Sequence, residues 1–499
     1  MSARPAPQSG GLSGPTSFED AGSTSLRSPL LCPAELWGLA DILADATDDV
    51  GLIETGNGCA IDVGVSFVEV CVIALALVSY ALISKRIEGW PLSMPMVFVG
   101  MGWITEATGV VSLSTDTGQV AVLAEVTLAI ILFGDAVRIN VRALGHDLSL
   151  PARLLLIGLP LSIATTTAVV ALVSPRLSLA EAALVAAVLA PTDAALGKEV
   201  VEDESVPQRI RRSLNVESGL NDGMVLPAVL IFLALAKGEE TTAGFWGRFV
   251  FQQVGLGVVI GVLAGAAGAW LLLRAQDRDW VEGIYAQLST LAVAILAFAG
   301  ADTAGANGLI AAFVAGLAFG TIAGRGRGDH LVEYTEDSGQ LLAVVSFFAF
   351  GNLFVNDALR ALSPGVVAAS VAALTLGRLL PVALAMAGTG AAWPTKAFVG
   401  WFGPKGLASI VFGLLLLEED LAGAEELFAI IALTVVASVF AHGASAAPWS
   451  RAYGRWFATM STHERQSMPE SLPVPPGRSR WSTARSRPGA DPDGGSGSR

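Results

Sequence analysis

Thirteen long apolar stretches dominate this chain of 499 residues and restrict what it can fold into. A bilayer core of about 30 Å needs roughly 20 apolar residues per helix, and such stretches follow one another from residue 63 onward. Only 15% of the residues are charged, whereas soluble domains carry about 25%. The sequence therefore predicts an all-α polytopic membrane protein. The expected spans are 63–84, 91–112, 119–140, 151–173, 179–200, 214–236, 245–273, 283–301, 304–323, 338–356, 364–388, 393–417 and 424–446.

Polar regions flank the apolar part on both sides. Residues 1–62 are rich in Ser, Pro, Gly and acidic residues, and they are predicted to be a disordered segment without a conventional signal peptide. Residues 63–448 form the predicted transmembrane domain. Residues 449–499, rich in Arg, Pro, Ser and Gly, are predicted to be a disordered cytoplasmic tail.

The distribution of basic residues predicts the orientation in the membrane. With the N-terminus outside and the loops alternating, the inside loops hold fourteen Lys and Arg residues and the outside loops four. Cytoplasmic loops carry such an excess. The pattern favours thirteen spans in a cell (inner) membrane, with the N-terminus outside and the C-terminus in the cytoplasm.

Other functional classes find little support in the composition. The net charge of −14 comes without a sustained basic patch, so no nucleic-acid partner is expected. Three cysteines without metal spacing and four scattered histidines predict neither a disulfide framework nor a resident metal. We expect no cofactor and no enzymatic activity.

The fifth expected span contains an aspartate beside a proline. Asp193 follows Pro191 and Thr192 near the middle of the span. Pro191 removes a backbone donor, and a helix break at this depth persists only where it is buried in protein or lines a cavity. A carboxylate is costly there unless it faces protein or water, which makes Asp193 and Thr192 candidate ion ligands. The alternative is a proline kink in which a neighbouring hydroxyl satisfies Asp193.

The sixth expected span carries four oxygen-bearing side chains within six residues. Helical spacing places Glu217 over Asn221 and Ser218 over Asp222, one turn apart. Oxygen ligands suit a hard cation such as Na⁺, for which H⁺ would compete. The alternative is a solvated helix end whose acids are favoured by the helix dipole, and this fits Glu217 better than Asp222.

Two basic residues lie inside later spans. Arg378, in span 11, needs a carboxylate partner if it is buried, and Glu217 is the expected one; the alternative is snorkelling to the interface. Lys405 lies in Gly-Pro-Lys-Gly, which is expected to break span 12 as Pro191 breaks span 5. Two interrupted helices in separate halves of a transporter indicate a site at the bilayer midplane. The alternative for Lys405 is a loop residue in a misassigned span.

Asp135 and Arg138 lie three residues apart near the inside end of span 3. At this spacing on a helix the two side chains are neighbours. We expect an ion pair that stabilises the helix end.

Several of these pieces together resemble a known family. The chain resembles the monovalent cation:proton antiporters, in the branch of the electroneutral sodium/proton exchangers, from about residue 64 to 448. That resemblance implies an inverted repeat, a dimerisation domain, a mobile core domain and two unwound helices that cross beside the ion site, here spans 5 and 12. The pieces are Leu132–Arg138, Ala190–Ala194, Glu217–Asp222, Gly308–Gly320, Arg378, Gly403–Ser409 and Phe440–Gly443.

The resemblance also implies roles for the ion-site residues. The family's Thr-Asp pair falls on Thr192 and Asp193, and its Asn-Asp pair falls on Asn221 and Asp222. By similarity, Asp222 is the main carrier of cation and proton, Thr192 and Ser218 help to ligate the transported Na⁺, and Asp193 holds the helix crossing. An Asn in place of a second acid implies electroneutral exchange.

Three charged residues match the family in supporting roles. Glu217 and Arg378 correspond to an internal ion pair, and Lys405 lies where the family usually has arginine. Lysine keeps the charge but loses the bidentate fork.

The resulting hypothesis is a Na⁺ (or Li⁺)/H⁺ antiporter for pH and sodium homeostasis, a homodimer by resemblance, with a monovalent cation, a proton and the lipid bilayer as its partners. A K⁺/H⁺ antiporter is the alternative within this class. Two other classes remain possible. An intramembrane aspartyl protease would use two aspartates that share a proton, but Asn221 stands where its Gly-x-Gly-Asp pattern needs glycine. An organic-anion transporter of similar fold would bind its substrate at Lys405 and Arg378.

Overall fold

The structure is a computed structural model, and it describes residues 67–87, 90, 92–111, 113, 117–139, 149–193, 196–238, 242–324, 326–417, 421, 423–460, 468 and 470. Within these residues the regular structure is helical, without a strand. The helices are α2 (Phe67–Ile87), α3 (Met94–Ala107), α4 (Thr117–Arg138), α5 (Ser149–Arg153), η3 (Leu154–Gly158), α6 (Leu159–Val173), α7 (Leu179–Val188), α8 (Lys198–Glu202), α9 (Gln208–Ala236), α10 (Ala243–Phe249), η4 (Val250–Leu256), α11 (Gly257–Gln276), α12 (Gly283–Thr303), α13 (Gly308–Ala323), α14 (Arg327–Arg360), α15 (Pro364–Leu374), α16 (Leu376–Ala385), α17 (Trp393–Trp401), α18 (Leu407–Leu417) and α19 (Ala424–Thr459).

Each of the thirteen predicted spans coincides with one helix or with consecutive helices separated by a break or a π-helical turn. In the described part of the chain, seven helical stretches are long and apolar enough to cross a membrane, and α7 and α13 are shorter apolar helices. The predicted all-α polytopic architecture is confirmed. The predicted N-terminal segment 1–62 lies outside the described residues.

The last helix is longer than predicted. The transmembrane domain was expected to end at residue 448, but α19 continues to Thr459. Aromatic packing explains the difference: Trp449 lies 5.1 Å from Trp401, and Tyr453 stacks on Phe398 of α17 at 4.3 Å between ring centroids. Helix α19 therefore extends about three turns beyond residue 448, while the boundary of the transmembrane domain stays a prediction.

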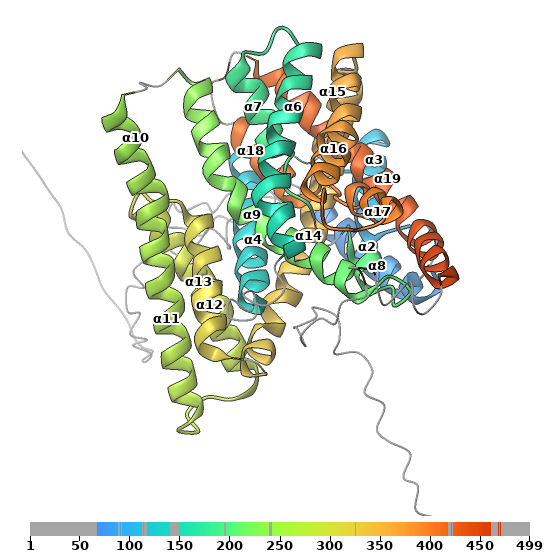
Figure 1. Cartoon of the computed structure of the whole chain (residues 1–499). Helices are drawn as coiled ribbons and strands as arrows, with labels where there is room; N and C mark the ends of the chain where they lie inside the picture. The colour runs from blue at the N-terminus through green and yellow to red at the C-terminus, as the bar shows by residue number, and fades with distance from the viewer. Residues whose placement is uncertain are drawn as a thin grey trace, which may run out of the picture.

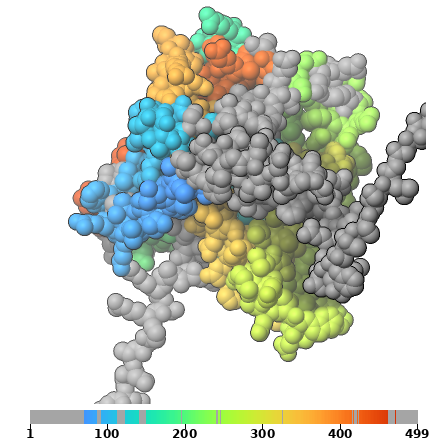
Figure 2. Space-filling model, turned by 180° about the vertical axis from the view of Figure 1, so that it is seen from behind, coloured from blue at the N-terminus to red at the C-terminus, as the bar shows by residue number. Residues whose placement is uncertain are grey.

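The helices divide into two sides around a central group (Figure 1). Helices α10, α11, α12 and α13 lie along one side, and α15, α16, α17 and α19 lie on the other, with α4 and α9 between them. Figure 2 shows the same division from behind, with the yellow-green helices around α11 at one side and the blue α2 and α3 at the other. Helix α13 packs along both α11 and α4, and α14 packs along α3 and α4.

Small residues allow α13 to lie close to α4. A Cβ added at Gly316 would lie 2.4 Å from the Phe133 carbonyl oxygen, and one at Gly320 would lie 2.0 Å from the Val137 carbonyl oxygen. Both distances are shorter than any tolerable contact, so only glycine fits. Small residues four apart bring helix backbones together in this way in membranes, which accounts for the glycines at the end of the 308–320 segment.

Candidate functional site: a crossing of two interrupted helices

The first interruption separates α7 from α8. Ser178 and Glu181 form a capping box at the start of α7, and the helix ends at Val188. Residues 191–193 have no regular secondary structure. Pro191 has no N–H to continue the helical ladder and it disfavours helical geometry at the residue before it. The predicted break in span 5 is present.

The second interruption, residues 402–406, separates α17 from α18 and crosses the first. The Asp193 N–H donates to the Pro404 carbonyl oxygen at 2.8 Å, and the Leu407 N–H donates to Oδ2 of Asp193, also at 2.8 Å. The Asp193 carboxylate thus sits at the N-terminus of α18, where a negative charge is favoured. A Cβ on Gly406 would lie 2.0 Å from the same Oδ2, so the crossing requires glycine there.

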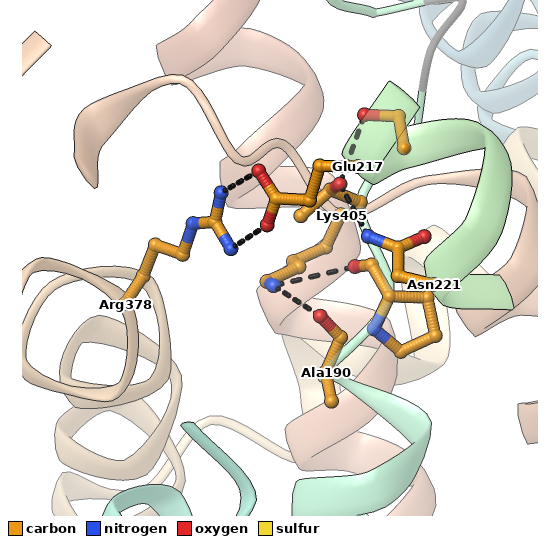
Figure 3. A network of polar contacts seen from close by, with 8 residues as sticks. Ala190, Glu217, Asn221, Arg378 and Lys405 are labelled. Carbon is orange, nitrogen blue, oxygen red and sulfur yellow. Dashed lines mark hydrogen bonds and ion pairs between the residues drawn. The ribbon is translucent and has the colours of Figure 1, made fainter. Parts of the chain in front are cut away.

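Lys405 stabilises the first break with a positive charge, as Asp193 stabilises the second with a negative one. Its Nζ donates to the carbonyl oxygens of Ala190 and Pro191 at 3.0 and 3.2 Å, just beyond the end of α7 (Figure 3). The residue is 2% exposed. A cation stabilises the C-terminal end of a helix and its unpaired carbonyls. Each broken helix therefore supplies the charge that the other one needs.

Two residues of α19, Ser438 and His442, contact the second interruption and the end of α17. The Lys405 N–H donates to Ser438 Oγ at 2.6 Å, and Ser438 contacts His442 Nδ1 at 3.1 Å. His442 Nε2 lies 3.0 Å from the carbonyl oxygen of Trp401, the last residue of α17. Sequence reasoning assigned no role to these residues, although Phe440–Gly443 was one of the segments that carried the family resemblance.

The expected ion pair between Glu217 and Arg378 is present beside Lys405 (Figure 3). The guanidinium donates to both carboxylate oxygens, at 2.5 and 2.8 Å, and both side chains are 3% exposed. This bidentate geometry is the strongest form of such a pair. Gly403 leaves room for it, because a Cβ there would lie 2.3 Å from Arg378 Nε.

A hydroxyl and amide chain joins the first break to α9. Thr192 Oγ1 lies 2.9 Å from Ser218 Oγ and accepts from Asn221 Nδ2 at 2.6 Å. Thr192 and Asn221 are each 1% exposed. The Asn221 side-chain oxygen has no hydrogen-bond partner within the part of the chain that the structure describes.

Asp222 lines a cavity next to these hydroxyl and amide groups. The cavity is lined by Asp193, Ser218 and Asp222, by Asp135 of α4 and Gln340 of α14, and by apolar side chains that include Leu128 and Phe347. Asp222 is half-buried, in contrast to its buried neighbour Asn221. The cavity thus brings carboxylate, hydroxyl and amide oxygens to one place, the ligand types that a hard monovalent cation takes.

Two features of this cavity were missed by sequence reasoning. Asp135 was assigned only to a pair with Arg138, and Gln340 was not considered. Arg138, which was expected to pair with Asp135, forms an ion pair with Glu336 of α14. The predicted topology is consistent with this pair, since the end of span 3 and the start of span 10 are both expected on the inner side.

An apolar helical bundle with two interrupted helices that cross at a carboxylate-lined cavity has the architecture of a secondary transporter, in which discontinuous helices form the site at the bilayer midplane. A family model described as sodium/hydrogen exchanger, transmembrane, matches residues 73–452. The chain belongs to this family, as the resemblance implied, and is a multi-pass membrane protein.

Individual relatives are distant. The K(+)/H(+) antiporter NhaP2 of Shewanella oneidensis is 26% identical over 383 residues, which cover 74% of this chain and 64% of that protein. The Na(+)/H(+) antiporter of Schizosaccharomyces pombe is 22% identical over 302 residues, covering 54% of this chain and 64% of that protein. This chain thus spans less than two thirds of the length of the curated relatives it matches.

Solved structures support the fold. The sodium proton antiporter MjNhaP1 from Methanocaldococcus jannaschii, determined at pH 8, matches with a TM-score of 0.61 at 18% identity. The match covers 75% of this chain and 98% of that one. At this identity the likeness concerns the fold.

Proposed function

We propose that this protein is an antiporter that exchanges a monovalent cation for H⁺, with Asp222 as the group that carries each in turn. The observation that carries the proposal is the position of Asp222: the residue lines the cavity at the crossing, together with Ser218 and Asp193. An ionisable residue in a membrane-spanning helix marks an ion pathway by default. The family membership of the chain supports the same class of function.

The hydrogen bonds around Asp193 and Asp222 indicate different roles for these two aspartates. Asp193 accepts from the Leu407 N–H at 2.8 Å and from the Leu196 N–H at 3.4 Å, so its oxygens are committed to the two breaks. Asp222 lies on a regular helix and faces the cavity. We assign Asp193 to holding the crossing and contacting the ion, and Asp222 to binding cation or proton.

Competition at one carboxylate gives coupled exchange. With a cation or a proton bound, the site is close to neutral and can change the side to which it opens, whereas an empty ionised carboxylate is costly to move through a low dielectric. Thr192, Ser218 and Asn221 supply neutral oxygens around the ion. Since Asn221 stands beside Asp222 in place of a second acid, we propose one cation per proton and electroneutral transport.

Two cations are candidates for the transported ion. The set of residue types at the site suits both Na⁺ and K⁺, because all the candidate ligands are oxygens. Relatives that match over about 74% of this chain are described as K(+)/H(+) antiporters, and others that match over less of it, 54% and 29%, as Na(+)/H(+) antiporters, one of them as a probable one. We propose Na⁺ or Li⁺ as the leading substrate and K⁺ as the second candidate. We also propose a homodimer in the cell (inner) membrane, with the N-terminus outside.

Exchange in reconstituted vesicles tests this proposal. Li⁺, Na⁺, K⁺ and Rb⁺ gradients are imposed across pH 6 to 9, with and without a valinomycin/K⁺ clamp, and internal pH is followed. We expect at least one alkali cation to drive proton movement at a rate independent of membrane potential. Asp222→Asn should lower that rate at least 100-fold, whereas Asp302→Asn, at an exposed position of α12, should not. Undiminished exchange by the Asp222 variant would reject the assignment.

A further inference from the structure

The first half of the second broken helix, α17, lacks a cap of its own. Its N-cap residue is Ala392, whose side chain cannot accept a hydrogen bond, and Pro394 occupies the first turn. The first N–H groups of a helix have no partner within the helix and need an acceptor. An outside group is therefore required at this end of α17.

Glu470 supplies that acceptor from beyond the end of α19. Its Oε1 accepts from the Ala392 N–H at 3.1 Å and from the Thr395 hydroxyl at 2.7 Å. Glu470 is 2% exposed and Thr395 is fully buried. A carboxylate this deeply buried on a helix N-terminus is favoured by the helix dipole.

The contact is tied to α19 as well. Thr395 Oγ1 lies 3.0 Å from the Tyr453 hydroxyl, so Tyr453, Thr395 and Glu470 form one hydrogen-bonded chain. Tyr453 also stacks on Phe398, one turn further along α17. The start of α17 is thus held by Tyr453 of α19 on one side and by Glu470 on the other.

The other end of α17 leads directly into the ion site. Its last residue, Trp401, is four positions before Lys405, whose Nζ donates to carbonyl oxygens at the start of the first break. Nine helical residues span only about 13 Å at 1.5 Å per residue. Helix α17 therefore connects the contact with Glu470 to the residues that lead to Lys405.

We propose that Glu470 is a positioning residue for transport, which acts through α17 to hold Lys405 and the helix crossing in their cation-binding arrangement. The transport part of this inference rests on the proposed antiport function, whereas the effect on α17 itself does not. Glu470, although it lies beyond the end of α19, thereby becomes part of the transport unit.

The first test is hydrogen–deuterium exchange of the purified full-length protein, which needs no transport. Glu470→Ala should speed exchange of the α17 amides at least tenfold, and Glu470→Gln should restore slow exchange because a side-chain amide oxygen still accepts both hydrogen bonds. Glu425→Ala removes a carboxylate from an exposed position at the start of α19 and should leave α17 unchanged. Unaltered exchange of α17 in Glu470→Ala would overturn the inference.

The second test separates positioning from mere stability. In vesicles holding equal amounts of folded protein, Glu470→Ala should raise the apparent KM for the transported cation threefold or more, with a smaller change in maximal rate. Thr395→Val should do the same, and the double variant should be no worse than either single one. An unchanged KM, or fully additive effects, would reject the positioning role. Absence of any exchange in the wild type would instead count against the proposed function and leave the first test intact.

Discussion

The interface between α4 and α13 and the crossing of the two breaks are both tightly packed, but different forces hold them. At the first, glycines such as Gly316 and Gly320 let an apolar helix touch the backbone of its neighbour. At the second, glycines make room for charged groups: Gly406 for Asp193 and Gly403 for Arg378.

This difference indicates that the α4–α13 interface contributes to stability, whereas the crossing of the interrupted helices contributes to the proposed transport. Apolar helix contacts in a membrane gain stability from dispersion and close fit, and they need no ionisable side chain. The crossing buries charges that cost free energy unless they are paired, and it holds them against exposed backbone ends beside a cavity. We attribute this arrangement to the proposed ion binding rather than to stability. Substitutions at the α4–α13 interface should therefore lower stability alone, whereas substitutions at the crossing should also change transport.

The largest expected effect is at the buried ion pair. Glu217→Ala leaves the Arg378 guanidinium buried without its carboxylate, and we expect a loss of about 3–5 kcal/mol in the free energy of unfolding. Thermal unfolding in detergent measures it. Asp357→Ala, which breaks an exposed pair with Arg360, should cost at most about 1 kcal/mol. Equal stability of Glu217→Ala and wild type would show that the pair is dispensable.

Loss of the charge at the first break comes next. Lys405→Met removes the donor from the Ala190 and Pro191 carbonyl oxygens, and we expect a cost of about 2–4 kcal/mol because two buried acceptors stay unsatisfied. Exchange should fall with stability. Lys396→Met, in the same interrupted span but only half-buried, provides the control. A Lys405 variant with normal unfolding temperature would contradict the reciprocal stabilisation of the two breaks.

An apolar-interface variant probes the other region. Gly320→Ala places a Cβ against the Val137 carbonyl and should cost about 1–3 kcal/mol by overpacking. The yield of folded protein should drop while the apparent KM of the remaining protein stays at the wild-type value. Gly300→Ala, which has open space around its Cβ, should be harmless. A change in KM for Gly320→Ala would undo the division between the two regions.

The smallest effect is expected for the hydroxyl between the break and α9. Thr192→Val removes the acceptor of the Asn221 amide and the partner of Ser218, at a cost of about 1 kcal/mol. If that loss falls on the cation-bound state, the apparent KM rises roughly fivefold to tenfold. Thr192→Ser should restore it. Cation titrations of transport by the wild type, Thr192→Val and Thr192→Ser measure these apparent KM values, and an unchanged KM in Thr192→Val would contradict the role of the hydroxyl.

The sequence allowed the spans, the two breaks and the partner of Arg378 to be predicted, because each rests on a local rule. Apolar length defines a span, Pro191 and Pro404 interrupt a helix, and a buried guanidinium requires a nearby acid. These rules act within one segment or between two charges of opposite sign.

What escaped prediction depends on how distant segments meet. The pairing of Arg138 with Glu336, the exposure of Asp135 to the cavity and the cap that Glu470 provides for α17 join residues of separate helices or of the segment after α19. The length of α19 was misjudged for the same reason, since its aromatic residues are stabilised by α17 and not by apolar periodicity.

The most direct test of the account is the number of protons released when a cation binds. Calorimetric titration of the purified protein with the transported cation, in two buffers of different ionisation enthalpy, gives that number without any membrane. The account predicts release of up to one proton per cation in the wild type at a pH where the site is protonated, and none in Asp222→Asn. Undiminished proton release by the Asp222→Asn protein would contradict it.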